Sequence, residues 1–103
     1  MTELLEIAAS WRQRGDRVAI ATVVATWGSS PNPAGSQLIV NERGDFMGSV
    51  SGGCVEGAVV QAATEVIDLG QPRLLRFAVS SDQAWAFGLA CGGTVQIYLE
   101  PLA

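Results

Sequence analysis

Residues 17–26 read RVAIATVVAT, an almost unbroken run of β-branched and small apolar residues. A strand with one solvated face alternates apolar and polar side chains, whereas a strand buried on both faces reads as a continuous apolar run. This stretch therefore predicts a strand that is covered on both faces, inside an α/β domain.

Two helices are predicted to provide that cover. Residues 3–14 carry an apolar stripe at helical spacing and are followed by the stop signal Gly15; the stripe consists of Leu4, Ile7, Ala8 and Trp11. Residues 54–69 predict the second helix, which ends before Gly70 and Pro72. Its buried face is predicted to consist of Val55, Val59, Ala62, Ala63, Val66 and Leu69, and its wet face of Glu56, Gln61, Thr64, Glu65 and Asp68.

Further strands complete the expected sheet. Residues 37–41 and 46–50 predict a hairpin around a turn at 42–45, and residues 73–79 and 94–100 predict two more strands. The last alternates, with Val95, Ile97 and Leu99 inward, and residues 82–87 predict a short helical turn. The fold class is α/β: a single small domain with a mixed β-sheet of about five strands and two main helices packed on it.

Composition excludes several classes of function. The chain has 103 residues, a net charge of −4, no histidine and no lysine, and its six arginines are scattered, although the fold could bring some together. Nucleic-acid binding needs a basic patch, so we expect no nucleic-acid partner. The sequence has no apolar run of membrane-spanning length and no signal-peptide pattern, so we expect a cytoplasmic protein without a membrane partner. In that compartment Cys54 and Cys91 are expected to be free thiols.

Three glycine-rich loops next to predicted strands are candidates for ligand binding. The first, at residues 28–36, offers the hydroxyls of Ser29 and Ser30 and leads into Gln37. Prolines stiffen this loop, although the same composition also suits an ordinary connector. Trp27 and Trp85 flank the first and third loops; aromatic side chains at such places more often pack into the core than bind a flat heterocycle.

The second and third loops each place a cysteine beside paired glycines. Ser51, Gly52 and Gly53 precede Cys54 at the predicted start of a helix, where backbone amides favour an anion and the helix dipole favours a thiolate. Glu56 adds negative charge there; it either positions a ligand or simply complements the dipole. Cys91 precedes Gly92 and Gly93. A small buried cysteine is the alternative interpretation of each thiol.

The spacing of the two cysteines excludes some familiar sites. They stand far apart in the sequence, so they form neither a C-x-x-C redox motif nor a zinc ribbon. Two thiols also provide too few ligands for a structural zinc site. A soft metal held partly by another ligand remains open, because thiolates suit such metals.

Several runs of the sequence, in order, resemble the XdhC/CoxI (CoxF) family of accessory factors for xanthine dehydrogenase and carbon monoxide dehydrogenase. The runs are ATWGSSP at 25–31, GSQ at 35–37, GSVSGGCVEG at 48–57 and GLACGGT at 88–94. Larger family members carry a Rossmann-like second domain, so the chain is expected to be one XdhC/CoxI-like domain, 1–103, without it. No motif for NAD or FAD carries over.

The resemblance implies maturation of molybdenum hydroxylases. Such a factor binds molybdenum cofactor (molybdopterin) transiently, assists its sulfuration or insertion, and acts as a chaperone more than as an enzyme. The implied site consists of Ser29, Ser30, Gln37, Ser51, Gly52, Gly53, Cys54, Glu56, Cys91, Gly92 and Gly93, with Cys54 and Cys91 as molybdenum ligands. The implied partners are the apo-enzyme, a cysteine desulfurase and a second copy of the chain.

Two other functions fit the same residues. A thiol protein could use Cys54 and Cys91 as a sulfur carrier or as a redox pair, which would require their Cα atoms to lie within about 7 Å. A non-catalytic module could instead bind larger family members without holding a cofactor. No pair of carboxylates or serine–base arrangement in the sequence indicates a hydrolase.

Overall fold

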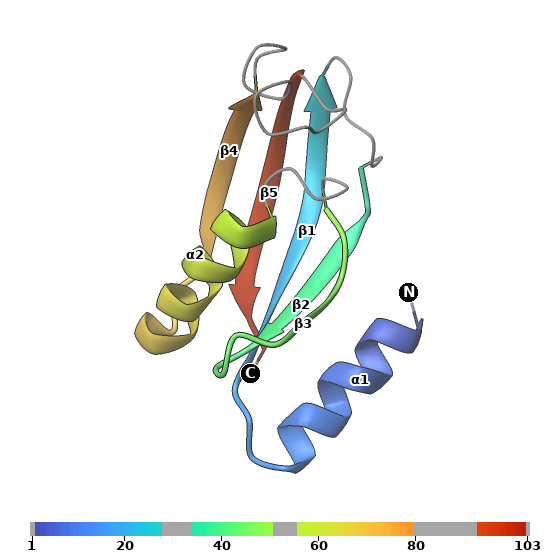
Figure 1. Ribbon diagram of the computed structural model, residues 1–103, viewed down its shortest axis with the longest axis vertical. Helices are drawn as coiled ribbons and strands as arrows, with labels where there is room; N and C mark the ends of the chain where they lie inside the picture. The colour runs from blue at the N-terminus through green and yellow to red at the C-terminus, as the bar shows by residue number, and fades with distance from the viewer. Residues whose placement is uncertain (1, 28–33, 51–55, 80–92, 103) are drawn as a thin grey trace.

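The computed structural model describes residues 2–27, 34–50, 56–79 and 93–102. Within these ranges, two helices and five strands follow one another (Figure 1). They are α1 (Thr2–Gln13), β1 (Val18–Trp27), β2 (Gln37–Asn41), β3 (Phe46–Gly48), α2 (Glu56–Leu69), β4 (Arg73–Val79) and β5 (Gly93–Pro101). The predicted elements are confirmed within a few residues. The turn predicted at 82–87 lies outside the described residues.

The five strands form one sheet in the order β3-β2-β1-β5-β4, with the apolar strand β1 at its centre. The prediction of a mixed sheet is wrong, because every described strand pair is antiparallel. Helix α2 does connect two strands that run in the same direction, β3 and β4, as a crossover does. Those strands lie at opposite edges of the sheet, so the crossover creates no parallel pair.

The two helices lie on opposite faces of the sheet. Helix α2 packs on one face, where alternate residues of β1, β2 and β5 form the larger core; its members include Ala21, Val23, Leu38, Val40, Val59, Ala63, Val66, Ile97 and Leu99. Helix α1 packs on the other face through Ala8, against Val18, Ile20 and Ile39. Both faces of the first half of β1 are therefore covered, as its sequence predicts.

The other half of the second face is open. A bulge between Val23 and Ala25 adds one residue to β1, and the extra residue, Val24, is exposed. Tyr98 of β5 and Leu74 of β4 pair with each other and are also exposed. Antiparallel sheets commonly tolerate one solvated face, so this half resembles the wet face predicted for β5.

Two residues of α2 depart from the predicted faces. Helical spacing predicts Leu69 inside the core, but it is 65% exposed, because it is the last helical residue before the chain turns away at Gly70. The same spacing predicts Glu56 on the wet face, but it is only 8% exposed. Glu56 can lie on the buried side because its carboxylate has hydrogen-bond partners outside the helix.

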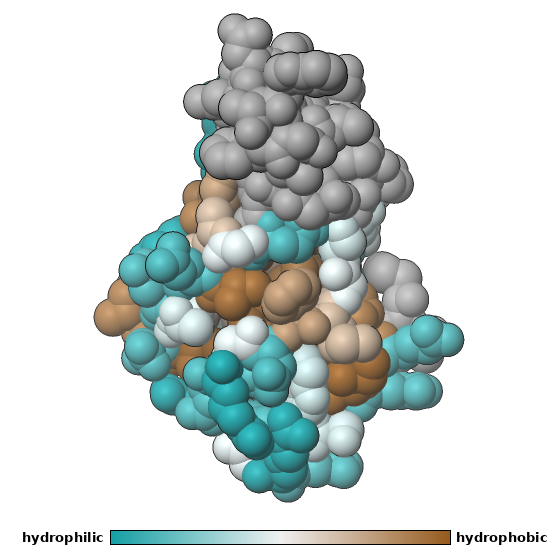
Figure 2. All heavy atoms as spheres, in the orientation of Figure 1, coloured by the Kyte–Doolittle hydropathy of each residue, from teal (hydrophilic) through white to brown (hydrophobic). Residues whose placement is uncertain are grey.

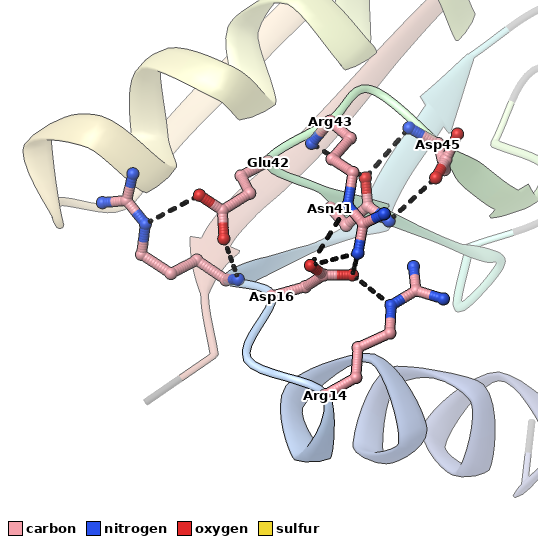
Figure 3. Close-up of polar contacts among 7 residues, drawn as sticks. Arg14, Asp16, Asn41, Glu42, Arg43 and Asp45 are labelled. Atoms are coloured by element: carbon pink, nitrogen blue, oxygen red, sulfur yellow. Dashed lines mark hydrogen bonds and ion pairs between the residues drawn. The ribbon is translucent and has the colours of Figure 1, made fainter.

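A polar cluster joins the start of β1 to the hairpin of β2 and β3 (Figure 3). Arg43 donates to both carboxylate oxygens of Asp16, at 2.7 and 2.9 Å, and Arg14 donates to the same carboxylate at 2.6 Å. The hydrogen bonds from Arg43 hold the pKa of Asp16 below its ordinary value against the effect of burial, and Arg14 acts in the same direction.

The same end of the molecule carries a second set of polar contacts. The side chain of Asn41 accepts from the backbone amides of Arg43 and Asp45, which shapes the hairpin turn. Arg17 reaches Glu42 on one side and Asp68 on the other. Hydrophilic residues accordingly gather at the lower end of the view in Figure 2. This polar cluster fixes the end of the sheet at which β1 begins.

Candidate functional site

The opposite end of the sheet anchors the glycine-rich loops. Trp27, the last residue of β1, pairs with Thr94 of β5, and Val79, the last residue of β4, pairs with Gly93. The first and third loops therefore leave and enter the sheet side by side, although their sequences are far apart (Figure 1). The described strands confirm that the fold brings these two loop anchors together.

Strand β3, which leads into the second loop, points toward the same end of the sheet but stops several residues short of it. Strand β3 runs in the same direction as β1 and stops at Gly48, which pairs with Leu38, the partner of Ala21. The next described residue after Val50 is Glu56, where α2 begins. Helix α2 then packs on β1 and β5, the strands that anchor the other two loops.

Most of the predicted site residues lie outside the described residues. They are Ser29, Ser30, Ser51, Gly52, Gly53, Cys54, Cys91 and Gly92. Trp85 lies outside them too. Three predicted site residues are described: Gly93 begins β5, Gln37 begins β2 and Glu56 begins α2. Their surroundings provide the observable geometry of the site.

Gln37 links three strands of the sheet. Its side-chain amide donates to the hydroxyl of Thr22 on β1 at 3.3 Å. Its backbone carbonyl accepts the amide of Ser49, just after β3, at 3.2 Å. The contacts of Gln37 that the structure describes hold the frame of the site together, and its role toward a ligand stays a prediction.

Glu56 ties the start of α2 to the residues that follow β3. Its Oε2 atom accepts a hydrogen bond from the hydroxyl of Ser49 at 2.8 Å and another from the backbone amide of Val50 at 3.0 Å. A buried carboxylate needs such partners, because burying a charge without them is costly. Its carboxylate also suits the first turn of a helix, where the dipole favours negative charge.

Gly48 fits its position for two independent reasons. Its φ of +95° lies in the left-handed region, which residues with a Cβ rarely adopt. A Cβ at this position would lie 2.4 Å from the backbone oxygen of Gln37 and 3.1 Å from Cδ1 of Leu4. This backbone also ends β3 earlier than the predicted residue 50, because the left-handed residue turns the chain out of the sheet.

Gly48 and Ser49 belong to the frame of the site, although the sequence motifs did not single them out. Both stand within the run GSVSGGCVEG, where the paired glycines beside the cysteine are the more conspicuous feature. The available signal is a glycine followed by a hydroxyl residue, between a predicted strand and a predicted helix. Such a pair often shapes the backbone rather than binding a ligand.

The described residues contain no group of three or more acidic, cysteine or histidine side chains that could hold a metal ion. Within the same ranges, neither helix is long and apolar enough to cross a membrane. The described residues thus provide a frame rather than a metal centre: strand ends that converge, with a hydroxyl, a carboxylate and an amide already bonded to one another.

The family model described as "XdhC and CoxI family" matches residues 11–78, which span most of this frame and the second glycine-rich loop. The chain belongs to the XdhC and CoxI family. The resemblance carried by the sequence motifs is confirmed.

Known proteins with similar sequences agree with this assignment. The chain is 33% identical over 99 residues to the molybdenum cofactor insertion chaperone PaoD of Escherichia coli, covering 96% of this chain and 31% of that protein. It is 30% identical over 87 residues to a probable xanthine dehydrogenase component of Bacillus subtilis, covering 82% of this chain and 26% of that protein.

A solved structure has the same fold. A crystal structure from Bacillus halodurans, described as a xanthine dehydrogenase, superposes with a TM-score of 0.79 at 30% identity. The match covers 96% of this chain and 30% of that one. The chain therefore spans less than a third of the length of these relatives.

Proposed function

We propose that this chain serves the maturation of molybdenum hydroxylases and binds molybdenum cofactor at the end of the sheet where the glycine-rich loops are anchored. Two observations support this proposal. The chain belongs to a family in which one relative is a molybdenum cofactor insertion chaperone. The register of β1, β4 and β5 places the anchors of the first loop, which carries serines, and of the third loop, which carries a cysteine, side by side.

The residues of the loops match the chemistry of the cofactor. Thiolates of Cys54 and Cys91 suit a soft metal, the hydroxyls of Ser29, Ser30 and Ser51 suit polar edges, and glycine amides at a helix start suit a phosphate. The cofactor, when bound, supplies the molybdenum centre of the client enzyme. The role of this chain is to bind, orient and release it, so we expect no turnover by the chain alone.

The client is proposed to be the apo-form of a molybdenum hydroxylase of the xanthine or carbon monoxide dehydrogenase type. Sulfuration of the cofactor would add a cysteine desulfurase as sulfur donor, and a second copy of the chain could complete the site. In the longer relatives, the part of the protein that this chain does not match could complete the site in place of a second copy.

Titration of the purified protein with molybdenum cofactor tests the proposal. We expect binding by the wild-type chain and a loss of affinity of about tenfold or more in the Cys54→Ala/Cys91→Ala variant, since a lost metal–thiolate or charged contact has at least that effect. Each single variant serves as the control for the other. Equal affinity in wild type and double variant would show that the thiols do not bind the cofactor.

The same preparation separates the thiol alternatives. Mass spectrometry after incubation with a cysteine desulfurase would reveal a persulfide if the chain carries sulfur itself. A disulfide between Cys54 and Cys91 that forms and reduces reversibly, without cofactor affinity, would favour the redox function.

A further inference from the structure

The two ends of the loop that carries Cys54 are joined by a single carboxylate. Residues 51–55 lie between Val50 and Glu56, and Oε2 of Glu56 accepts the backbone amide of Val50 at 3.0 Å. The same oxygen accepts the hydroxyl of Ser49 at 2.8 Å. The loop is thus closed at its base by two hydrogen bonds to one atom.

This arrangement differs from the capping of a helix by its own first turn. In a capping box, an acidic residue reaches back three positions to the residue that begins the helix. Glu56 reaches back six and seven positions, to residues that follow β3. The contact therefore joins two separate elements, the strand side and the helix side of the loop.

Both sides of this contact are held rigidly. Val50 is fully buried in the larger core, and the amide of Ser49 is bonded to the carbonyl of Gln37. Gly48 packs so closely on Gln37 that it leaves no room for a Cβ. In general, a hydrogen bond that joins the two ends of a segment reduces the conformational freedom available to it.

The burial of a charge at this position also calls for a reason. An apolar side chain would suit the face of α2 that packs on the core, where Val59 and Ala63 lie. A buried carboxylate contributes directional hydrogen bonds that an apolar residue lacks. Here these hydrogen bonds fix the positions of Ser49 and Val50 relative to the start of α2.

We propose that Ser49 and Glu56 are positioning residues that hold the Cys54 loop in place through the hydrogen bonds of Glu56 to Ser49 and Val50. This proposal deepens the proposed function, since it concerns the same site. It assigns Glu56 a role through the loop rather than direct contact with the cofactor. What matters for this role is an acceptor oxygen at the loop base, and the negative charge matters less.

Alkylation of single cysteines by iodoacetamide tests this role without any cofactor. A Cys91→Ser background reports the rate at Cys54 alone, and a Cys54→Ser background reports the rate at Cys91. We expect Glu56→Met and Ser49→Ala to change the Cys54 rate by about tenfold or more, the effect of leaving a buried hydrogen-bonding group without its partner. The Cys91 rate should stay within about twofold, since general loosening of the fold would move both.

Conservative variants separate positioning from charge. Glu56→Gln keeps an acceptor oxygen, and Ser49→Thr keeps the hydroxyl, so both should retain the wild-type rate at Cys54 within about threefold. Glu65→Met is the matched control, because Glu65 lies on the same helix with an exposed side chain paired to Arg73. The double variant Ser49→Ala/Glu56→Met should resemble the Glu56→Met variant, because the two residues share one contact.

Three results would overturn the proposal. One is a Cys54 rate unchanged by both Glu56→Met and Ser49→Ala. Another is parallel changes at Cys54 and Cys91. The third is a Glu56→Gln variant as impaired as Glu56→Met, which would assign the effect to charge. If Glu56→Met does not fold, Ser49→Ala and hydrogen exchange at the Val50 amide decide the question. Since none of these measurements uses cofactor, they can fail while the proposed function holds, and the reverse.

Discussion

Replacement of Gly48 by alanine tests the geometry at the base of the site most directly. The left-handed φ of +95° costs a residue with a Cβ about 1–2 kcal/mol. The new Cβ would also lie 2.4 Å from the carbonyl oxygen of Gln37, which the sheet and the hydrogen bond from the Ser49 amide hold in place. Overpacking of this kind costs about 1–3 kcal/mol, so the two effects together destabilise the fold by about 2–5 kcal/mol.

Two other glycines provide matched controls for this variant. Gly35 has nearly the same φ, +96°, but an added Cβ there would meet no atom within 4 Å, so Gly35→Ala should cost only the conformational 1–2 kcal/mol, roughly. Gly57 lies in α2 with open space around it, so Gly57→Ala should stabilise the fold by about 0.5–1 kcal/mol. Comparison of the three separates conformation, contact and helix propensity.

Urea denaturation followed by circular dichroism gives the three free energies of unfolding. A small domain has a total stability of about 5–15 kcal/mol, so a loss near the upper estimate would leave Gly48→Ala marginally folded. With a urea dependence of about 1–3 kcal/mol per molar, the midpoint should fall by at least about 0.7 M. If Gly48→Ala costs no more than Gly35→Ala, the close approach to Gln37 contributes nothing and the reasoning is refuted.

Three further predictions concern the rest of the frame. Because the folded pKa of Asp16 is lowered, its contribution to stability should be present above the unfolded pKa near 3.8 and lost as the pH falls through the folded value. Urea titrations of wild type and Asp16→Asn between pH 7 and about pH 2 should therefore draw together only below about pH 3.8, and curves that stay parallel throughout would contradict this. Arg43→Lys should lower the unfolding midpoint at neutral pH, since the guanidinium holds the Asp16 carboxylate through two nitrogens, Nε and Nη2, whereas an ammonium has only one. A midpoint equal to the wild type would show that one nitrogen suffices. Leu99→Ala, in the core, should cost about 2–5 kcal/mol, whereas Leu74→Ala, on the open half of the sheet, should cost much less, and similar losses in the two would mean that the open half is covered in solution.

The elements of the fold could be predicted from the sequence because their signals are local. Strands at 37–41 and 73–79 match the observed bounds, and the stripe of Leu4, Ile7, Ala8 and Trp11 packs as predicted. The direction of strand pairing could not be predicted, since it depends on which strands become neighbours in the sheet. If β3 and β4 lay side by side they would form a parallel pair, but they lie at opposite edges. Only the long-range pairing of β5 with both β1 and β4 decides it.

The site could be predicted only in part, because its motifs are local in the sequence whereas its contacts join distant residues. Motif order identified the glycine-rich loops and the family, but not the mutual contacts of Ser49, Val50 and Glu56, because helical spacing assigns Glu56 to solvent. The ion pairs around Asp16 could not be predicted from the sequence either. Its members come from the end of α1 and from the hairpin, and only the fold brings Arg14 and Arg43 to one carboxylate.

The central place of β1 has a consequence for how the chain folds. Its neighbour on one side, β2, follows after nine residues, and β2 with β3 forms a local hairpin. Its neighbour on the other side, β5, starts only at Gly93, so two segments far apart in the sequence must come together before β1 is enclosed. Pairing between distant segments slows folding, and an apolar strand with an open edge invites association with other chains meanwhile. During synthesis, the second edge of β1 therefore stays unprotected until β5 has emerged.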